Sequence, residues 1–358
     1  MTLHVFNPEH EIALAFDCEN ITLPHAIQEF KMNLGFIPSF WANDGDYVLV
    51  EDSEFAAKSA KSVKSITADV HFIEKDELSN YTFTKVKPWG WDKCLCSYLY
   101  NAKCNGPIPN KATINIIREL SSRKQTVKLL PFLRRGLESY TVGQSFYIDS
   151  FDDVIKLISQ FGEVVIKTLW SSSGRGIRYV SNHTLDKSVS GWIRNAISLQ
   201  GGVTLECYYN KVKDFAMEFY SYGNGIVDYQ GLSIFDTVKG HYSGNIIADE
   251  DSKLRFLLKY LSCELLTEIK TRIISYFAPL LNKVYEGPFG VDMMIVSDPS
   301  QGFYLNPCIE INMRRTMGHV ANSIIHFDTD PDKIMRIVHN VNYRMKFEPI
   351  ENCFVKVF

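Results

Sequence analysis

Short apolar runs alternate with polar-faced helical patterns in the N-terminal part of the chain. Three runs have the length and composition of strands: residues 2–6, 46–50 and 70–73. Residues 54–65 have helical spacing, and such alternation is typical of a small, mostly parallel sheet. We expect KPWGWD, at residues 87–92, to leave this sheet. We interpret CNGPIPN, at residues 104–110, as a linker because it contains Gly and Pro.

The rest of the chain predicts hairpins and longer helices. Strand character is found at residues 163–168, 177–180, 203–209, 215–222, 226–233, 290–296 and 302–312. Helical spacing is found at residues 111–123, 151–160, 189–199, 254–284 and 332–341. Pro279 should bend or end the second piece of the long helix, and Gly-Asn-Gly at residues 223–225 predicts a hairpin turn. The expected fold class is therefore α/β followed by α+β.

Length and charge narrow the class of protein. The 358 residues suggest two or three domains, and the formal net charge of −3 argues against a general nucleic-acid binder. No apolar run reaches the roughly 18 residues of a membrane helix. The first residues lack the charged and apolar regions of a signal peptide, so we expect a cytoplasmic protein. The eight cysteines lack zinc-site spacing and are expected to be buried free thiols.

The first candidate for chemistry is a loop rich in small residues. Lys167 ends an apolar strand, WSSSGRG follows at residues 170–176, and a second strand begins at once. Small residues let backbone N–H groups approach an anion, and the lysine adds positive charge. The order differs from a P-loop, in which the lysine follows the glycines and opens a helix. The segment therefore predicts a flap over phosphates, and the alternative is a surface hairpin with a solvated lysine.

The second candidate is a hairpin that carries carboxylates. The strands at residues 290–296 and 302–312 are joined by a short turn, and antiparallel pairing places Asp292 opposite residues 308–310. Glu310 and Asn312 are two residues apart and share a face. Two carboxylates and an amide oxygen suit Mg²⁺ that bridges nucleotide phosphates. The alternative is that the carboxylates pair with arginines such as Arg314 and Arg315.

A third group follows the first strand, where ligands often bind in parallel sheets. Asn7, Glu9 and His10 are candidates for the site of a second substrate. The alternative is a helix start, in which Asn7 caps the helix and Pro8 lies in its first turn.

Taken together, these signals resemble the ATP-grasp superfamily over about residues 110–322. The order is strand, lysine, flap, strand, a segment LECYY at residues 205–209, and a carboxylate hairpin that ends in EINMRRTMGH at residues 310–319. The resemblance implies an ATP-grasp fold behind a Rossmann-like N-terminal domain. The implied division is an N-terminal α/β domain at 1–108, a lid at 109–203 and a C-terminal α+β part at 204–358.

The resemblance also implies roles for individual residues. Lys124 matches the first phosphate-contacting lysine, for which Arg123 could substitute, and Lys167 matches the second. The implied flap consists of Ser171, Ser172, Ser173, Gly174, Arg175 and Gly176. The implied adenine and ribose contacts are Glu206, Tyr208 and Asp214, and the implied magnesium ligands are Asp292, Glu310 and Asn312. Arg314 matches an arginine near the transferred phosphoryl group, Lys239 and His241 match a further phosphate contact, and Arg315 is a candidate substrate contact.

Two positions depart from the superfamily pattern. Gly290 stands where peptide-type ligases often carry an arginine, which argues against the D-alanine ligase reaction itself, and Met313 replaces a proline. The implied function is an ATP- and Mg²⁺-dependent ligase that activates a carboxylate as an acylphosphate for attack by an amine or a thiol. The alternatives are a small-molecule kinase and a non-catalytic nucleotide-binding protein. The implied partners are ATP and a small-molecule or peptide substrate, without nucleic acid or membrane, and related ligases often form homodimers.

Overall fold

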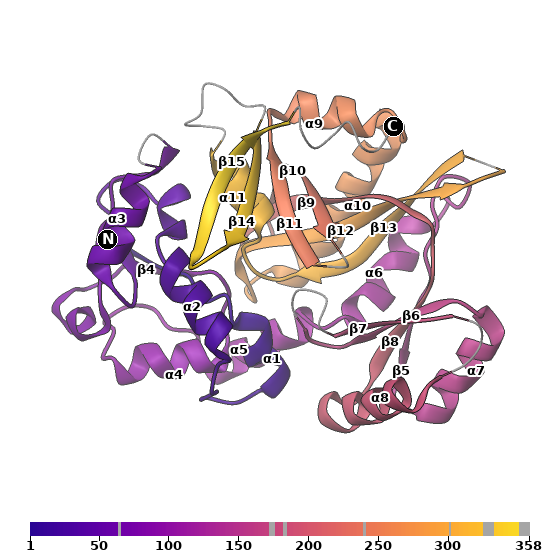
Figure 1. Cartoon of the computed structure of the whole chain (residues 1–358), viewed down its shortest axis with the longest axis horizontal. Helices are drawn as coiled ribbons and strands as arrows, with labels where there is room; N and C mark the ends of the chain where they lie inside the picture. The colour runs from indigo at the N-terminus through magenta and orange to yellow at the C-terminus, as the bar shows by residue number, and fades with distance from the viewer. Residues whose placement is uncertain are drawn as a thin grey trace.

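A computed structural model describes residues 1–63, 66–171, 176–181, 185–238, 241–300, 302–324 and 333–350. These residues form three sheets, which follow one another along the chain (Figure 1). The N-terminal domain and the small sheet lie on two sides of the large C-terminal sheet (Figure 1). The mixed α/β and α+β fold class expected from the sequence is confirmed.

The N-terminal sheet is parallel throughout, as predicted. Its order is β3-β2-β1-β4, and the strands are β1 (Thr2–Val5), β2 (Tyr47–Leu49), β3 (His71–Ile73) and β4 (Lys85–Pro88). The helices between and after them are α1 (His10–Phe16), α2 (His25–Leu34), α3 (Ser53–Lys61) and α4 (Lys93–Asn101). KPWGWD leaves the sheet after Pro88, and Asp92 then caps α4 by accepting a hydrogen bond from the N–H of Leu95 (2.8 Å).

The small sheet is antiparallel, in the order β5-β8-β6-β7. Its strands are β5 (Ser145–Ile148), β6 (Val164–Thr168), β7 (Ile177–Val180) and β8 (Val203–Cys207). Helices α7 (Phe151–Phe161) and α8 (Lys187–Gln200) cover its outer face and share a core with it (Figure 1). Strand β8 belongs to this sheet, so we propose that the lid ends after residue 207 rather than after residue 203. The boundary between the N-terminal domain and the lid stays after residue 108.

The large sheet has seven strands, in the order β13-β12-β9-β10-β11-β14-β15. The first five in sequence are β9 (Lys211–Tyr222), β10 (Val227–Val238), β11 (His241–Ile247), β12 (Glu286–Asp298) and β13 (Gly302–Asn312). The helices around it are α6 (Lys124–Arg134), α9 (Glu250–Leu257), α10 (Cys263–Leu281) and α11 (Met317–Ile324). Helix α5 (Lys111–Leu120), which precedes α6, lies beside the N-terminal domain (Figure 1). Helix α10 continues past Pro279 for two residues before it ends.

The prediction of a helix at residues 332–341 is wrong. Residues 333–339 form strand β14 (Lys333–His339), which pairs with β11 and with β15 (Tyr343–Pro349). The local spacing of apolar residues fits a helix and a strand equally well. The exposed edge of β11 decides the outcome, because pairing with it satisfies the backbone and buries Ile334 and Met335.

The side chains of β9 alternate between the two faces of the large sheet. Phe215, Met217 and Phe219 point into the apolar core that α10 covers. Asp214 and Glu218 have the opposite parity and therefore point to the other face. The period-2 rule thus gives the large sheet one apolar face and one face that carries acidic residues.

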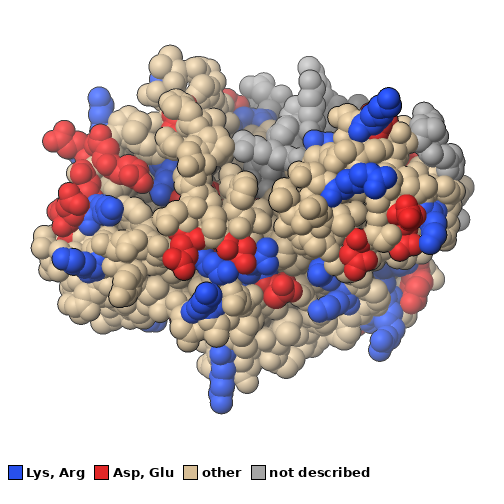
Figure 2. Space-filling view, turned by 90° about the horizontal axis from the view of Figure 1, so that it is seen from below, with Lys and Arg blue, Asp and Glu red and all other residues tan. Residues whose placement is uncertain are grey.

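Charge is mixed on the face of the molecule that Figure 2 shows. Lys and Arg side chains lie among Asp and Glu side chains there, and the described residues form no continuous basic patch on that face. Among the described helices, none combines the length and the apolar composition that a membrane crossing requires.

Candidate functional site

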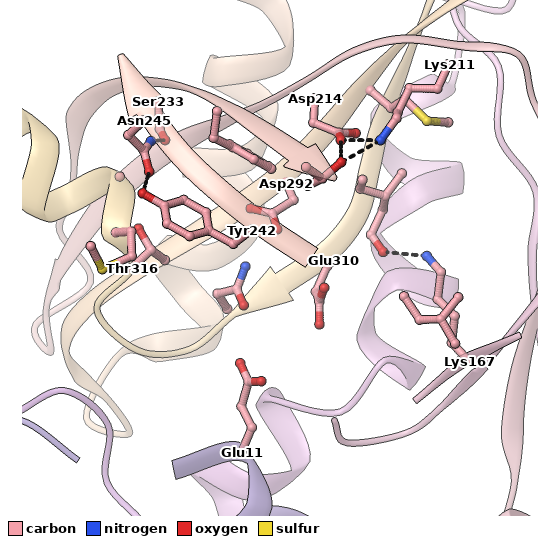
Figure 3. A pocket seen from close by; sticks show the side chains of 18 of the residues that line it. Glu11, Lys167, Lys211, Asp214, Ser233, Tyr242, Asn245, Asp292, Glu310 and Thr316 are labelled. Atoms are coloured by element: carbon pink, nitrogen blue, oxygen red, sulfur yellow. Dashed lines mark hydrogen bonds and ion pairs between the residues drawn. The ribbon is translucent and has the colours of Figure 1, made fainter. Parts of the chain in front are cut away.

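A cavity of about 730 Å³ lies between the small sheet, the acidic face of the large sheet and the N-terminal domain. Its volume is within the range of about 300–1,000 Å³ that is usual for small-molecule sites. Figure 3 shows Lys167, Lys211 and Asp214 on one side of it and Thr316 and the Ser233–Asn245 pair on the other, with Asp292 and Glu310 between them. Glu11 enters from the N-terminal domain (Figure 3).

Strand register brings the acidic residues together. Asp292 on β12 lies opposite Glu310 on β13, and Gly290 lies opposite Asn312. The hairpin register predicted from the sequence is therefore confirmed. On the other side of β12, Ala216 is opposite Asp292 and Glu218 is opposite Gly290. Since opposed residues share a face, the acidic side chains of three neighbouring strands converge on the cavity.

The carboxyl of Asp292 is strongly affected by its surroundings. Burial raises its pKa well above the usual value, and the nearby carboxyls of Glu310 and Glu218 raise it further. Arg314 and a hydrogen bond with Asn312 act in the opposite direction but do not outweigh burial. Like carboxyls held this close favour either a bound proton or a cation.

The donor set fits a hard divalent cation. Asp292, Glu310 and Asn312 offer oxygen atoms on one face of one hairpin, which is the ligand chemistry of Mg²⁺. Within the described part of the chain, no group of three or more His, Cys, Asp and Glu side chains could hold a metal. Two carboxylates and one amide fill only part of an octahedral shell, which leaves positions for phosphate oxygens and for the water that Mg²⁺ usually retains.

Arg123 reaches this cluster from the N-cap of α6. Its Nη2 donates to Oε1 of Glu310 (2.5 Å), and its Nη1 donates to the carbonyl oxygen of Thr168 (2.7 Å) and to Oγ of Ser171 (2.8 Å). Glu310 thus faces an arginine, as the ion-pair alternative held, but the arginine comes from residue 123 rather than from residues 314 or 315.

The prediction for Lys124 needs a correction. Its Nζ lies over the ring of Tyr147, 4.0 Å from the centroid, and Lys124 is not among the residues that line the cavity. Position 124 is the first residue of α6, so its side chain leaves the helix axis in a different direction from that of Arg123. Arg123, which the sequence offered as the substitute, lies at the cluster.

Lys167 and Glu206 form a buried ion pair at the end of the cavity next to the small sheet. Nζ of Lys167 donates to Oε2 of Glu206 (2.7 Å) and to the carbonyl oxygen of Ile309 (3.1 Å). The two strands are paired, because Val165 on β6 is opposite Glu206 on β8. Tyr208 follows β8 and also lines the cavity. We call this part of the cavity the hinge end (Lys167, Glu206, Tyr208 and Asp214).

Asp214 completes the hinge end from β9. Its Oδ2 accepts hydrogen bonds from Nζ of Lys211 (2.5 Å) and from Oγ1 of Thr237 (3.0 Å). Asp214 therefore presents a preorganised carboxylate to the cavity, two residues along the strand from the position opposite Asp292.

The two neighbouring arginines differ in position. Arg314 lines the cavity and donates to Oε1 of Glu11 through Nε (2.7 Å) and Nη2. Arg315 points away from the cavity and stacks on the ring of Trp41, with Cζ 4.3 Å from its centroid. Burial lowers the pKa of Arg315 to about 10. The placement of Arg315 at the substrate is therefore corrected, and Glu11 is a lining residue that sequence reasoning missed.

The N-terminal candidates also lie outside this cavity. Asn7 donates to Oδ2 of Asp92 (3.0 Å), and Nδ1 of His10 lies 3.1 Å from the same oxygen, so both side chains hold the cap of α4. Glu9 accepts a hydrogen bond from Lys31 (2.9 Å) and faces a separate cavity of about 190 Å³. The helix-start alternative is also wrong for Asn7, because the N-cap of α1 is Glu9 and the side chain of Asn7 stabilises the start of α4 instead.

Part of the expected flap and loop is not described. Ser172, Ser173, Gly174, Arg175 and Lys239 lie outside the described residues, and His241 is described only as the first residue of β11. Ser171 and Gly176 border the flap. A Cβ at residue 176 would meet Oγ of Ser171 and Oγ1 of Thr168 at 2.2 Å, so the close approach requires glycine there.

Sequence reasoning missed the polar residues at the other end of the cavity. Tyr242 donates to Oδ1 of Asn245 (2.7 Å), and Nδ2 of Asn245 donates to Oγ of Ser233 (2.8 Å). Glu218 accepts a hydrogen bond from Oγ1 of Thr316 (2.7 Å). The sequence did contain a signal for Glu218. It is an acidic residue inside the apolar strand FAMEFY, and it lies an even number of residues from Asp214, so both side chains point to the same face.

Glu218 is 1 % exposed and lies beside a neutral histidine. Nε2 of His319 lies 3.1 Å from the carbonyl oxygen of Phe219, which requires a proton on Nε2, and Nδ1 accepts from the N–H of Thr316 (3.2 Å). Burial lowers the pKa of His319 to about 3 and raises that of Glu218 to about 7. Nδ1 is 3.0 Å from Oε2 of Glu218, a contact that is favourable when the carboxyl carries a proton.

No protein-family model matches the sequence, and no curated protein matches it significantly. Solved structures do match. The chain is similar to biotin carboxylase from Campylobacter jejuni, solved in a complex with β,γ-ATP, with a TM-score of 0.50, 15% sequence identity and coverage of 94% of this chain and 75% of that one. The chain has the ATP-grasp fold.

Two further ATP-grasp comparisons have lower scores. A protein from Archaeoglobus fulgidus assigned to the ATP-grasp superfamily gives a TM-score of 0.47 at 14% identity, with 98% of this chain and 100% of that one covered. D-alanyl-alanine synthetase A from Vibrio cholerae gives 0.47 at 13% identity, with 91% and 92% covered. In the ATP-grasp fold of this chain, the small antiparallel sheet and the large sheet enclose the cavity between them.

Proposed function

We propose that this ATP-grasp chain is an ATP- and Mg²⁺-dependent ligase that activates a carboxylate as an acylphosphate for attack by an amine or, less often, a thiol. One observation carries the proposal. The oxygen cluster of Asp292, Glu310 and Asn312 faces the same cavity as Lys167 and Arg314. Hard oxygen ligands beside fixed cations are what phosphoryl transfer from a nucleotide requires.

The hinge end is suited to the nucleoside. The aromatic ring of Tyr208 and the apolar side chains of Val165 and Ile177 form walls for a base, and Asp214 offers a carboxylate to a ribose hydroxyl. Lys167 lies 2.7 Å from Glu206 and supplies a cation to the phosphates. A bound Mg²⁺ would neutralise phosphate charge at the oxygen cluster, which is the chemistry that the ion contributes.

The residues of the chain do the rest of the work by position and charge. Arg314 lies at the carboxylate hairpin and is held by Glu11, so its guanidinium is oriented before any substrate arrives. Arg123 ties the flap border at Ser171 to the cluster at Glu310. Charges that are fixed in advance stabilise a transferring phosphoryl group without reorganisation in the transition state.

Calorimetry with Mg²⁺ and ATP tests the nucleotide site. We expect binding that needs Mg²⁺ in the wild type and is at least tenfold weaker in Glu310→Gln, while exposed Glu264→Gln on α10 binds as the wild type does. No binding by a folded wild type would limit the ATP-grasp resemblance to architecture.

Hydroxylamine then tests the reaction class. It is an amine that traps acylphosphates as hydroxamates. Amino acids and short peptides can therefore be screened as carboxylate substrates for hydroxamate formation that is coupled to ADP release. A hydroxamate that depends on ATP supports the ligase. A stable phosphorylated product formed without any amine indicates a kinase, and tight ATP binding without turnover indicates a nucleotide-binding protein that does not catalyse.

A further inference from the structure

The cavity continues beyond the oxygen cluster into a part that the proposed nucleotide contacts do not use. We call this part the acceptor end and define it by its lining residues Phe6, Phe30, Trp89, Glu218, Ser233 and Thr316. Glu218 is four residues along β9 from Asp214, with Ala216, opposite Asp292, midway between them. The acceptor end and the hinge end therefore lie on opposite sides of the cluster, as the positions of Thr316 and Lys167 in Figure 3 illustrate.

Two glycines make the space for the carboxyl of Glu218. A Cβ at Gly290 would lie 2.4 Å from its Oε2, and a Cβ at Gly318 would lie 2.1 Å from its Oε1. The space beside residue 290 is therefore filled by a carboxyl, which gives the acceptor end acidic chemistry.

The nearby cations are committed to other partners. Lys253 donates to the carbonyl oxygen of Leu232 (3.0 Å) and to Asn322, Arg314 is held by Glu11, and Arg315 stacks on Trp41. Among the described residues, no lysine or arginine forms an ion pair with Glu218. Its Oε2 lies 3.0 Å from Nδ1 of His319, which presents a lone pair rather than a proton, so the ionised carboxylate receives no hydrogen bond at this oxygen. A buried carboxyl in this situation favours a ligand that brings N–H groups.

Ser233 adds a second acceptor next to Glu218. Its Oγ accepts a hydrogen bond from Nδ2 of Asn245, and Oδ1 of Asn245 accepts one from Tyr242. These two hydrogen bonds fix the position of the Ser233 hydroxyl. A Cβ at Gly318 would also lie 2.4 Å from this Oγ, which shows that Ser233 and Glu218 border the same small space.

The opposite wall of the acceptor end is aromatic. The ring of Phe6 packs against Trp89, with centroids 5.1 Å apart, and against Phe30 at 6.0 Å. Trp89 is tied to the polar side because its carbonyl oxygen accepts from the N–H of Arg315 (2.8 Å), the residue before Thr316. The polar and the apolar walls are therefore parts of one recess.

We propose that Glu218 and Ser233 bind the amino group of the acceptor. The apolar or aromatic substituent of the same molecule lies against Phe6, Phe30 and Trp89. The inference rests on the proposed ligase function for its placement of the amine as the attacking group, and it assigns the acceptor to amines with a bulky apolar substituent.

Calorimetry with three probes tests the two walls. We expect 2-phenylethylamine to bind at least tenfold more tightly than 2-phenylethanol, which lacks the amino group, and than methylamine, which lacks the ring. Glu218→Gln keeps the size of the side chain and should weaken 2-phenylethylamine at least tenfold without changing 2-phenylethanol. Phe30→Ala should weaken 2-phenylethylamine but not methylamine. Exposed Glu286→Gln, on the same sheet, is the matched control.

Each titration is run with and without Mg²⁺ and β,γ-methylene-ATP, and thermal unfolding verifies that every variant is folded. Amine binding without nucleotide binding would overturn the proposed function and leave the acceptor end standing. Nucleotide binding without any amine binding would overturn the acceptor end alone, as would equal affinities of Glu218→Gln and the wild type for 2-phenylethylamine. A merely structural Glu218 would change the unfolding temperature and leave the preference for the amine over the alcohol intact.

Discussion

Oε2 of Glu218 lies 3.0 Å from Nδ1 of His319, and both side chains are buried. Unfolding at pH 6 moves a proton from the carboxyl to the imidazole, because the pKa of Glu218 is about 7 in the fold and that of His319 is about 3. The unfolded chain holds the proton on histidine, with ordinary pKa values of about 4.3 for Glu and 6.5 for His. The pair therefore binds about one proton in both states.

The first prediction follows from this balance. Between about pH 5 and 6 the pair contributes little pH dependence to the free energy of unfolding. In Glu218→Gln, no carboxyl proton offsets the proton that His319 binds on unfolding. In this pH window the unfolded state therefore binds one proton more than the folded state. Stability should then rise with pH by about 1.4 kcal/mol per unit relative to the wild type. Urea unfolding at several pH values measures the difference, and parallel curves for the two proteins would refute the proton assignment.

The second prediction concerns the carboxyl of Asp292, whose pKa is raised by burial and by Glu310 and Glu218. A raised pKa means that the fold binds the proton more tightly, so the wild type loses stability as the pH rises through that value. Asp292→Asn removes this loss and should make the metal-free protein more stable than the wild type at pH 9, with a difference that disappears as the pH falls toward about 4, the pKa of Asp in the unfolded chain. The same variant should lose Mg²⁺-dependent ATP binding. Unfolding curves in EDTA provide the test, and a destabilised variant at pH 9 would contradict it.

The third prediction separates Arg123 from its neighbour Lys124. Arg123→Gln breaks the bonds to Glu310, Thr168 and Ser171 and should cost about 2 kcal/mol of stability, since Glu310 is only partly buried. It should also weaken Mg²⁺–ATP at least tenfold. Lys124→Gln loses one cation–π contact and should change ATP affinity less than threefold. Calorimetry measures the ATP affinities. Equal losses of ATP affinity in the two variants would indicate that Lys124 contacts the phosphates after all.

The fourth prediction uses the glycines around Glu218. Gly290→Ala and Gly318→Ala place a methyl group within 2.4 Å of its carboxyl oxygens and should each destabilise the protein by about 1–3 kcal/mol. Glu218→Ala in the Gly290→Ala background should recover part of that loss. Gly191→Ala, in α8 with nothing within 4 Å, should instead stabilise by about 0.5–1 kcal/mol. Thermal unfolding of these four variants and of Glu218→Ala alone gives the comparison, and additive losses at 218 and 290 would show that the two positions do not touch.

The sequence by itself determined what depends on neighbours along the chain. A short turn and the period of two were enough to place Asp292 opposite Glu310, because a hairpin is closed by local geometry. The alternation of strands and helices was enough to predict the parallel N-terminal sheet, because parallel neighbours need a crossover connection between them. The sequence also shows that Glu218 and Phe219 point to opposite faces of their strand. Only the paired sheet shows which of these faces lines a cavity.

Tertiary structure decided the contacts between distant segments. Arg123 meets Glu310 across 187 positions, and no local pattern distinguishes it from Lys124. Residues 333–339 became a strand because the edge of β11 was open to them. Glu218 lies beside Gly290 only because β9 pairs with β12 in one register of several that the alternation allows. Packing over the whole sheet selects that register, and with it the acidic recess beside the aromatic wall of the N-terminal domain.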